Sequence, residues 1–198
     1  AVDVPVTVKH RIGVDDFDSY DFLTDFVGTV ADTGCETFIV HARKAWLKGL
    51  SPKQNREIPE LDYGRVYQLK QDFPDLEIII NGGITDLEQS KQHLTQIDGV
   101  MIGREAYTNP YLLAEVDQQI YGSENSMQSR KKVAEDFIQY VDNELSQNIK
   151  LQSMTRHILG LFHGMPGARQ FRRHISENAH QPNATIDVLI EALAKTTG

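Results

Sequence analysis

The feature that most constrains the fold is a series of short apolar segments, separated by stretches with helical periodicity. Residues 37–40, 78–80 and 100–102 are continuous apolar runs, and valines alternate with other residues from Val2 to Val8. Short, continuous apolar strands are typical of parallel sheets that helices cover on both faces. The sequence therefore predicts an α/β fold with a parallel sheet.

A polar residue follows each predicted strand, at Lys9, His41, Asn81 and Arg104. The spacing of these strand ends averages about 31 residues, as in a (β/α)₈ barrel of about 250 residues, whose active site lies at the carboxyl ends of the strands. Four βα units are expected here, and eight are needed to close a barrel. The pattern predicts half of a TIM barrel, with two strand edges that favour pairing with another chain.

Three helices are expected between these strands. The first spans 19–32, and the second spans 61–73 and ends before Pro74. Thr85 and Glu88 form a capping box for the third, which is expected to reach about residue 97. The apolar stripe predicted for the first helix consists of Phe22, Phe26, Val27 and Val30.

The pattern changes after about Gly122, where no further strand is predicted. Helical spacing extends over 126–147, 151–162, 168–178 and 185–195. The predicted organisation is a C-terminal half of a TIM barrel at 1–122, followed by an all-α helical domain at 123–198.

Charge is distributed unevenly along the chain. The formal net charge is −8, yet the windows 37–56 and 150–176 contain no acidic residue. Local basic windows suit contacts to phosphate, and chance clustering on solvated faces explains them equally well. The basic residues are Arg43, Lys44, Lys48, Lys53 and Arg56 in the first window, and Lys150, Arg156, Arg169, Arg172 and Arg173 in the second.

Several classes of protein are disfavoured by the composition. The single cysteine, Cys35, excludes an internal disulfide framework and suits a reducing cytoplasm. It precedes a predicted strand, so a packing role is favoured over a catalytic one. We see no zinc-ligand spacing, no apolar stretch long enough to span a membrane and no secretory signal.

Two glycine-containing strand ends predict a phosphate site. Asn81-Gly82-Gly83 and Gly103-Arg104 follow successive predicted strands. Glycine lets backbone N–H groups approach phosphate oxygens, and an arginine adds a bidentate contact. A tight turn is the simpler explanation for a single Gly-Gly, but the two sites together favour cofactor binding.

The preceding strand ends add groups that suit a flavin. A lysine such as Lys9 can stabilise an anionic reduced ring, and His41 can hydrogen-bond the ring or its phosphate. A long basic loop at 46–56 follows, and Lys53 and Arg56 within it are candidates for contacts to RNA phosphates or bases. The alternatives are solvated strand-end groups and a mobile lid.

Five ordered motifs resemble the tRNA-dihydrouridine synthases. They are V-K-H-R-I-G at 8–13, F-I-V-H-A-R at 38–43, S-P-K-Q-N-R-E-I-P at 51–59, I-N-G-G-I at 80–84 and D-G-V-M-I-G-R-E-A-Y at 98–107. The basic loop and the tail G-L-F-H-G-M-P-G-A-R-Q-F-R-R at 160–173 resemble the A-type subfamily, which reduces uridines 20 and 20a of the tRNA D loop.

The resemblance implies a flavin-binding TIM barrel followed by a helical tRNA-binding domain. It implies that NADPH reduces FMN, that the flavin gives hydride to C6 of uracil, and that a cysteine acid protonates C5. The FMN-binding positions that it implies are Lys9, His41, Asn81, Gly82, Gly83, Gly103 and Arg104. The tRNA-contacting positions are Lys53, Arg56, Arg169 and Arg172.

The family's catalytic cysteine has no counterpart in this sequence, because Cys35 does not match it. The chain alone is therefore expected to be inactive, with no catalytic residue and no metal site of its own. Two alternatives stay open at this point. One is a flavin barrel that reduces a free pyrimidine, as dihydroorotate dehydrogenases do, and the other is an RNA-binding fragment without catalysis.

Overall fold

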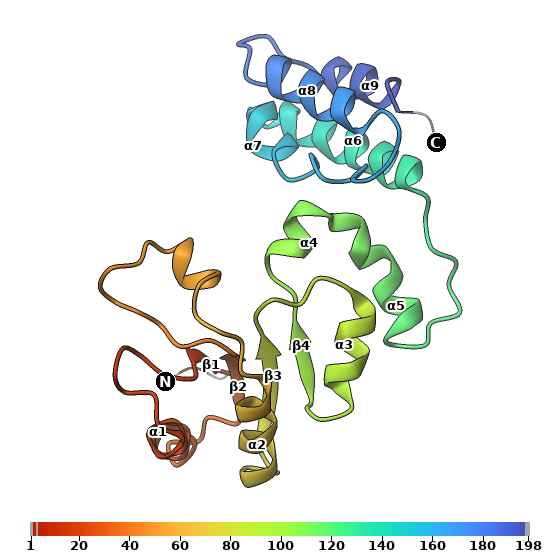
Figure 1. Ribbon diagram of the computed structural model, residues 1–198. Helices are drawn as coiled ribbons and strands as arrows, with labels where there is room; N and C mark the ends of the chain where they lie inside the picture. The colour runs from red at the N-terminus through yellow and green to blue at the C-terminus, as the bar shows by residue number, and fades with distance from the viewer. Residues whose placement is uncertain (1, 3, 197–198) are drawn as a thin grey trace. The chain divides into compact units, whose positions relative to one another are not determined.

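In the computed structural model, which describes residues 2 and 4–196, the first half of the chain forms a four-stranded parallel sheet in the order β1-β2-β3-β4 (Figure 1). The strands are β1 (Thr7–Arg11), β2 (Thr37–His41), β3 (Glu77–Asn81) and β4 (Gly99–Met101). The connecting helices are α1 (Tyr20–Ala31), α2 (Tyr63–Asp72) and α3 (Leu87–Leu94), with a short 3₁₀ helix, η1, at Gln54–Arg56. Every neighbouring pair of strands is parallel, as the βα pattern predicts.

One face of this sheet forms the core of the first half. Phe38 and Val40 of β2 and Ile78 and Ile80 of β3 are fully buried, and they pack with the inward side chains of α1 and α2. Those inward side chains are Leu23, Val27, Val66 and Leu69. The alternate positions point to the opposite face, where Lys9 is exposed and Ile39 and Ile79 are half-buried. The sequence predicted helices on both faces, and within the first half of the chain α1 and α2 cover one face.

The expected limits of the first strand were wrong, and the expected face of the first helix was confirmed for Val27 and Val30 but wrong for Phe22 and Phe26. β1 begins at Thr7, and Val2, Val4 and Val6 are exposed outside it. Leu23 and Val27 face the sheet, whereas Phe22 and Phe26 are more than a third exposed. Both pairs are spaced i, i+4 on adjacent rows of one helix, so periodicity alone could not decide which row meets the core.

The cap of α3 lies one residue later than predicted. Asp86, and not Thr85, is the N-cap, and its side chain accepts the backbone N–H of Gln89 at 2.7 Å. The Gln89 side chain in turn hydrogen-bonds the backbone N–H and the hydroxyl of Thr85. Two-way hydrogen bonding like that of a capping box is therefore present, but it involves Gln89 in place of the predicted Glu88. The helix ends at Leu94, before the predicted residue 97.

The second half consists, among its described residues, of helices and loops. The elements are α4 (Arg104–Thr108), η2 (Pro110–Glu115), α5 (Val116–Gln119), α6 (Arg130–Ser146), α7 (Leu151–Thr155), α8 (Ala168–Asn178) and α9 (Asp187–Leu193). Figure 1 shows α8 and α9 in one layer and α6 and α7 in another. Between them lies a core that includes Val141, Leu161, Phe171, Ile175 and Leu189, all nearly or fully buried.

The chain divides into two compact units, which we call the sheet unit, ending at Gly103, and the helical unit, beginning at Arg104. The predicted boundary lay near residue 122. Residues 104–119 form short helices, and Tyr111 among them packs against the core of the helical unit. The predicted helix 151–162 also ends early, at Thr155, and tight turns follow it. The helix predicted over 168–178 is confirmed as α8.

Candidate functional site

The uncovered face of the sheet brings together polar side chains from three strands. Arg11, His41, Asn81 and Met101 are register partners on neighbouring strands, and Lys9 lies one row before them on the same face. The amine of Lys9 donates a hydrogen bond to Asn81 Oδ1 at 3.1 Å. The Asn81 amide in turn donates to the Met101 carbonyl at 2.7 Å. Two of the predicted cofactor-binding side chains, Lys9 and Asn81, are therefore in direct contact.

Lys9 lies in the middle of β1 and not at its end, because the strand continues to Arg11. Partial burial, and secondly the positive charge of Arg11, lower the pKa of the Lys9 amine. Both effects disfavour the ammonium form. A negatively charged ligand on this face would offset them, so Lys9 is suited to meet an anionic group.

Gly82 and Gly83 follow β3 with φ angles of 116° and 72°, which favour glycine. A Cβ atom on Gly82 would lie 2.6 Å from the His41 ring, and one on Gly83 would lie 2.6 Å from Leu61 Cδ1. The Tyr63 hydroxyl fixes this turn by donating to the Gly82 carbonyl at 2.7 Å. The turn at the end of β3 thus requires glycine for backbone and packing reasons together.

Gly103 follows the neighbouring strand. The prediction that the strands before the two glycine sites are neighbours is confirmed by the pairing of Asn81 with Met101. Gly103 is exposed, and a Cβ atom there would meet nothing within 4 Å. The Gly82-Gly83 turn and Gly103 therefore lie at the same edge of the sheet. Arg104 opens α4 in the helical unit, and its contact to a cofactor phosphate stays a prediction.

The basic loop after β2 is tied down from several sides. The Asn55 side chain accepts the Trp46 N–H and donates to the Trp46 carbonyl, both at 2.7 Å. The Arg11 guanidinium donates to the Lys44 and Asn55 carbonyls at 2.9 and 3.0 Å. The Lys44 amine lies 4.3 Å from the centre of the Trp46 ring. These hydrogen bonds hold the loop in a defined conformation. Lys53 and Arg56, which flank Asn55 in the sequence, are exposed.

The arginines of α8 lie near the start of the helix, as predicted. Phe171 and Ile175 occupy the buried side of this helix, and Arg169, Arg172 and Arg173 are exposed. Arg173 pairs with Glu177 at 2.7 Å across one turn. This ion pair engages the Arg173 side chain within its own helix.

Comparisons with known proteins decide the family. The model of the family described as "Dihydrouridine synthase (Dus)" matches residues 1–197. The chain belongs to the dihydrouridine synthase family. It is 64% identical over 195 residues to a tRNA-dihydrouridine(20/20a) synthase of Vibrio cholerae, which covers 98% of this chain and 60% of that protein.

Two further relatives of the same name agree with this assignment. The Escherichia coli K12 protein is 60% identical over 193 residues, which cover 97% of this chain and 56% of the relative. The Yersinia pestis protein is 58% identical over 195 residues, which cover 98% and 56%. This member of the family thus spans about three-fifths of the length of the relatives it matches.

The prediction of a packing role for the single cysteine of this family member agrees with its surroundings. Cys35 is half-buried just before β2, and its thiol contacts the Val6 and Thr37 carbonyls at 3.6 Å each. It lies at the amino end of its strand, whereas His41 ends the same strand at the carboxyl edge. The described residues contain no group of His, Cys, Asp and Glu that could hold a metal ion. They also contain no helix long and apolar enough to cross a membrane.

Sequence reasoning missed three residues that build this site in the dihydrouridine synthase chain: Arg11, Asn55 and Tyr63. Arg11 was detectable, because a period of two along a strand places it on the same face as Lys9. Asn55 and Tyr63 act through backbone partners distant in sequence, at Trp46 and Gly82. No local pattern carries that information.

Proposed function

We propose that this chain is part of a tRNA-dihydrouridine synthase, an oxidoreductase that reduces uridine to 5,6-dihydrouridine in the D loop of tRNA with FMN and NADPH. The observation that carries the proposal is the polar row on the uncovered sheet face beside the turn at Gly82 and Gly83. Curated relatives of the same family, named tRNA-dihydrouridine(20/20a) synthases, support this substrate.

We infer that the sheet unit is half of a (β/α)₈ barrel and that its uncovered face points to the barrel interior. The parallel order β1-β2-β3-β4, with helices on one face, supports this inference. Among the described residues, β1 and β4 each have a strand partner on one side. The part of the relatives that this chain does not span would supply the remaining strands. Residues 123–198 would then form the tRNA-binding domain.

The residues present fit an FMN molecule. The turn at 82–83 requires glycine, because a Cβ atom there would meet His41 or Leu61, and Gly103 leaves open space at the same edge. Lys9, His41, Asn81, Gly82, Gly83, Gly103 and Arg104 would hold the cofactor. When bound, FMN would supply the hydride-transfer chemistry of the reaction, with NADPH as the source of electrons.

The chain's own residues would bind and orient the reactants. The Lys9 amine, oriented by Asn81, would place positive charge against the flavin ring, and His41 would pack beside Gly82 to fix the turn. Lys53 and Arg56 would contact tRNA near the active site, while Arg169 and Arg172 would contact it from the helical unit. Cys35 lies at the other end of β2, so we infer that the proton donor lies outside this chain.

The first test is dihydrouridine formation in unmodified tRNA by the full-length protein with NADPH and FMN, beside this chain alone. The full-length protein is expected to modify tRNA. The chain alone is expected to be inactive, because absence of general-acid catalysis removes about 10²–10⁴-fold in rate. A full-length protein that reduced a free pyrimidine and left tRNA unmodified would contradict the proposal. Dihydrouridine formation by this chain alone, at the rate of the full-length protein, would also contradict it.

The second test is flavin retention. Arg104→Ala in the full-length protein is expected to lower FMN occupancy after purification, because the variant lacks one guanidinium group that would bind the phosphate. Arg156→Ala, which removes an exposed arginine elsewhere in the helical unit, is the matched control. Equal occupancy in both variants would remove Arg104 from the cofactor site.

A further inference from the structure

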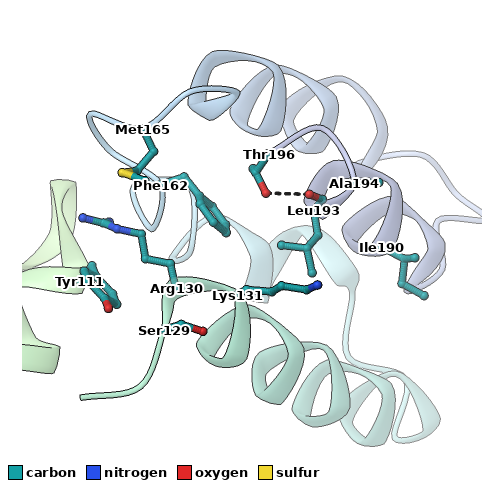
Figure 2. Close-up of a pocket in the computed structure, with 10 residues that line it drawn as sticks. All are labelled: Tyr111, Ser129, Arg130, Lys131, Phe162, Met165, Ile190, Leu193, Ala194 and Thr196. Carbon is teal, nitrogen blue, oxygen red and sulfur yellow. Dashed lines mark hydrogen bonds between the residues drawn. The ribbon is translucent and has the colours of Figure 1, made fainter. Parts of the chain in front are cut away.

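The helical unit contains a pocket of about 580 Å³ that no residue assigned above lines (Figure 2). Its walls come from η2, the start of α6, the turns before α8 and the end of α9. The volume lies in the range of sites that enclose a small molecule or one residue of a polymer, about 300–1,000 Å³. The residues that line the pocket indicate what kind of ligand it would bind.

One side of the pocket carries a fixed cation. The Arg130 guanidinium carbon lies 3.9 Å from the centre of the Tyr111 ring, and Arg130 also donates to the Leu161 carbonyl. The Tyr111 hydroxyl donates to the Gln128 carbonyl at 2.8 Å, which holds the ring in place. A guanidinium has five N–H donors, so others remain to bind an anion while this stack stays intact.

The charge of the lining is entirely positive. Arg130 and Lys131 line the pocket together, and no aspartate or glutamate is among the lining residues, in a chain of net charge −8. Figure 2 shows the Lys131 side chain extended toward the α9 side. The exposed Lys131 forms no ion pair among the described residues, whereas the next residue, Lys132, pairs with Asp136. This arrangement favours a ligand with a negative group.

The rest of the lining is mostly apolar. Phe162 is buried in the pocket wall, whereas Met165 and Ile190 are 38% and 47% exposed. Leu193 completes this apolar wall. Large apolar side chains that stay open to solvent beside two cations suit a ligand with a flat apolar body and an anionic group.

We propose that this pocket binds a single unstacked nucleotide of the RNA, with its base against the apolar wall and its phosphate at Arg130 and Lys131. The inference rests on the proposed function, because tRNA supplies the nucleotide. Continuity along the chain supports an RNA occupant. Met165 lines the pocket in the turn just before α8, and Arg169 follows in the first turn of that helix. Contacts to the flat face of the base and to the phosphate are two of the means by which proteins hold unstacked nucleotides.

The test uses the full-length protein and cytidine monophosphate, a nucleotide that is not the substrate of the reduction. Ile190→Trp would fill the pocket and is expected to raise the dissociation constant about 5- to 150-fold, the range for one stacked base. Lys131→Gln is expected to weaken binding, Lys131→Arg to restore it, and Lys132→Gln to leave it unchanged. Thermal unfolding of each variant identifies any loss of fold.

Three results would overturn the pocket proposal. The first is that inorganic phosphate binds as tightly as the nucleotide. The second is that decanoate binds more tightly than the nucleotide. The third is that the Ile190→Trp variant is folded and still binds the nucleotide with wild-type affinity. Dihydrouridine formation in tRNA is measured on the same samples. If the wild-type protein modifies tRNA normally but binds no nucleotide in the pocket, the pocket proposal is wrong and the proposed function stands. If the wild-type protein does not modify tRNA, the proposed function is wrong.

Discussion

The sheet unit and the helical unit differ in how their cores are closed. In the sheet unit, Phe38 and Ile80 are fully buried on one face, while Lys9 and Arg11 lie on the uncovered face. In the helical unit, α6, α7, α8 and α9 all contribute buried side chains to one core. A sheet with one uncovered face needs more chain to complete it, whereas a closed helical core does not. We infer that most of the cofactor contacts belong to the sheet unit, and that α8 of the helical unit adds RNA contacts to those of the basic loop.

The largest effect is expected from a substitution that leaves a cavity in the core of the helical unit. Phe171 is 1% exposed, and its ring lies 4.9 Å from that of Phe162. Phe171→Ala is expected to destabilise the helical unit by about 3–5 kcal/mol. In the full-length protein, tRNA affinity should fall while FMN occupancy stays constant. Tyr140→Ala, at an exposed aromatic, is the control, and joint loss of FMN and tRNA binding would show that the units do not act separately.

The glycine turn allows the opposite experiment in the sheet unit. Gly82→Ala is expected to lower FMN occupancy, because the new methyl group meets the His41 ring and the left-handed backbone costs about 1–2 kcal/mol. Gly34→Ala is the matched control, since Gly34 has a φ of 95° and open space around it. Absorbance at flavin wavelengths after purification measures the outcome. Equal FMN loss in both variants would mean that backbone strain alone is responsible.

The basic loop gives a smaller effect that separates substrate binding from cofactor binding. Asn55→Ala removes both hydrogen bonds to the Trp46 backbone, at a cost of about 1–2 kcal/mol. We expect the KM for tRNA to rise about 5- to 30-fold, with kcat and FMN occupancy little changed. Gln54→Ala, which removes a hydrogen bond from the Ser51 N–H but none to Trp46, is the comparison and is expected to change KM less. A fall in kcat with an unchanged KM would place Asn55 in a role other than positioning Lys53 and Arg56.

The smallest expected effect concerns acid stability of the sheet unit. Burial lowers the pKa of His10, whose ring packs against Phe26 and Phe38. Below about pH 6.5 the unfolded chain therefore binds more protons at this position than the folded one, and stability falls as pH falls. His10→Phe is expected to reduce this slope, by at most about 1.4 kcal/mol per pH unit. Denaturant unfolding between pH 7 and 5 measures it, and parallel curves would exclude His10 as a cause.

Elements with a strong local signal were predictable from the sequence. β2, β3 and α8 lie within a residue of their expected limits, because apolar runs define the two strands and Pro166-Gly167 precedes the helix. The limits of β1 and the inward row of α1 depend on packing against distant residues. The short helices within residues 104–119 were missed because they bury few side chains of their own and depend on the helical unit for support.

The candidate site was predictable in outline only. Strand ends indicated His41, Asn81 and the glycines, since parallel strands align their carboxyl ends. The hydrogen bond from Lys9 to Asn81 could not be read from the sequence, because it spans β2 between the two residues. The loop anchors and the pocket beside Tyr111 and Arg130 likewise arise from tertiary contacts.

The most direct test of the division between the two units is the salt dependence of tRNA affinity for the full-length protein. Wild type is compared with Arg169→Ala/Arg172→Ala and with Arg173→Ala, which removes an arginine of the same helix that pairs with Glu177. Removing one arginine–phosphate interaction should flatten the slope of log affinity against log salt by about 0.7–0.9. We predict a flatter line for the double variant, a wild-type slope for Arg173→Ala and unchanged FMN occupancy throughout. Three superimposable lines would contradict the account, because α8 would then not contact the RNA.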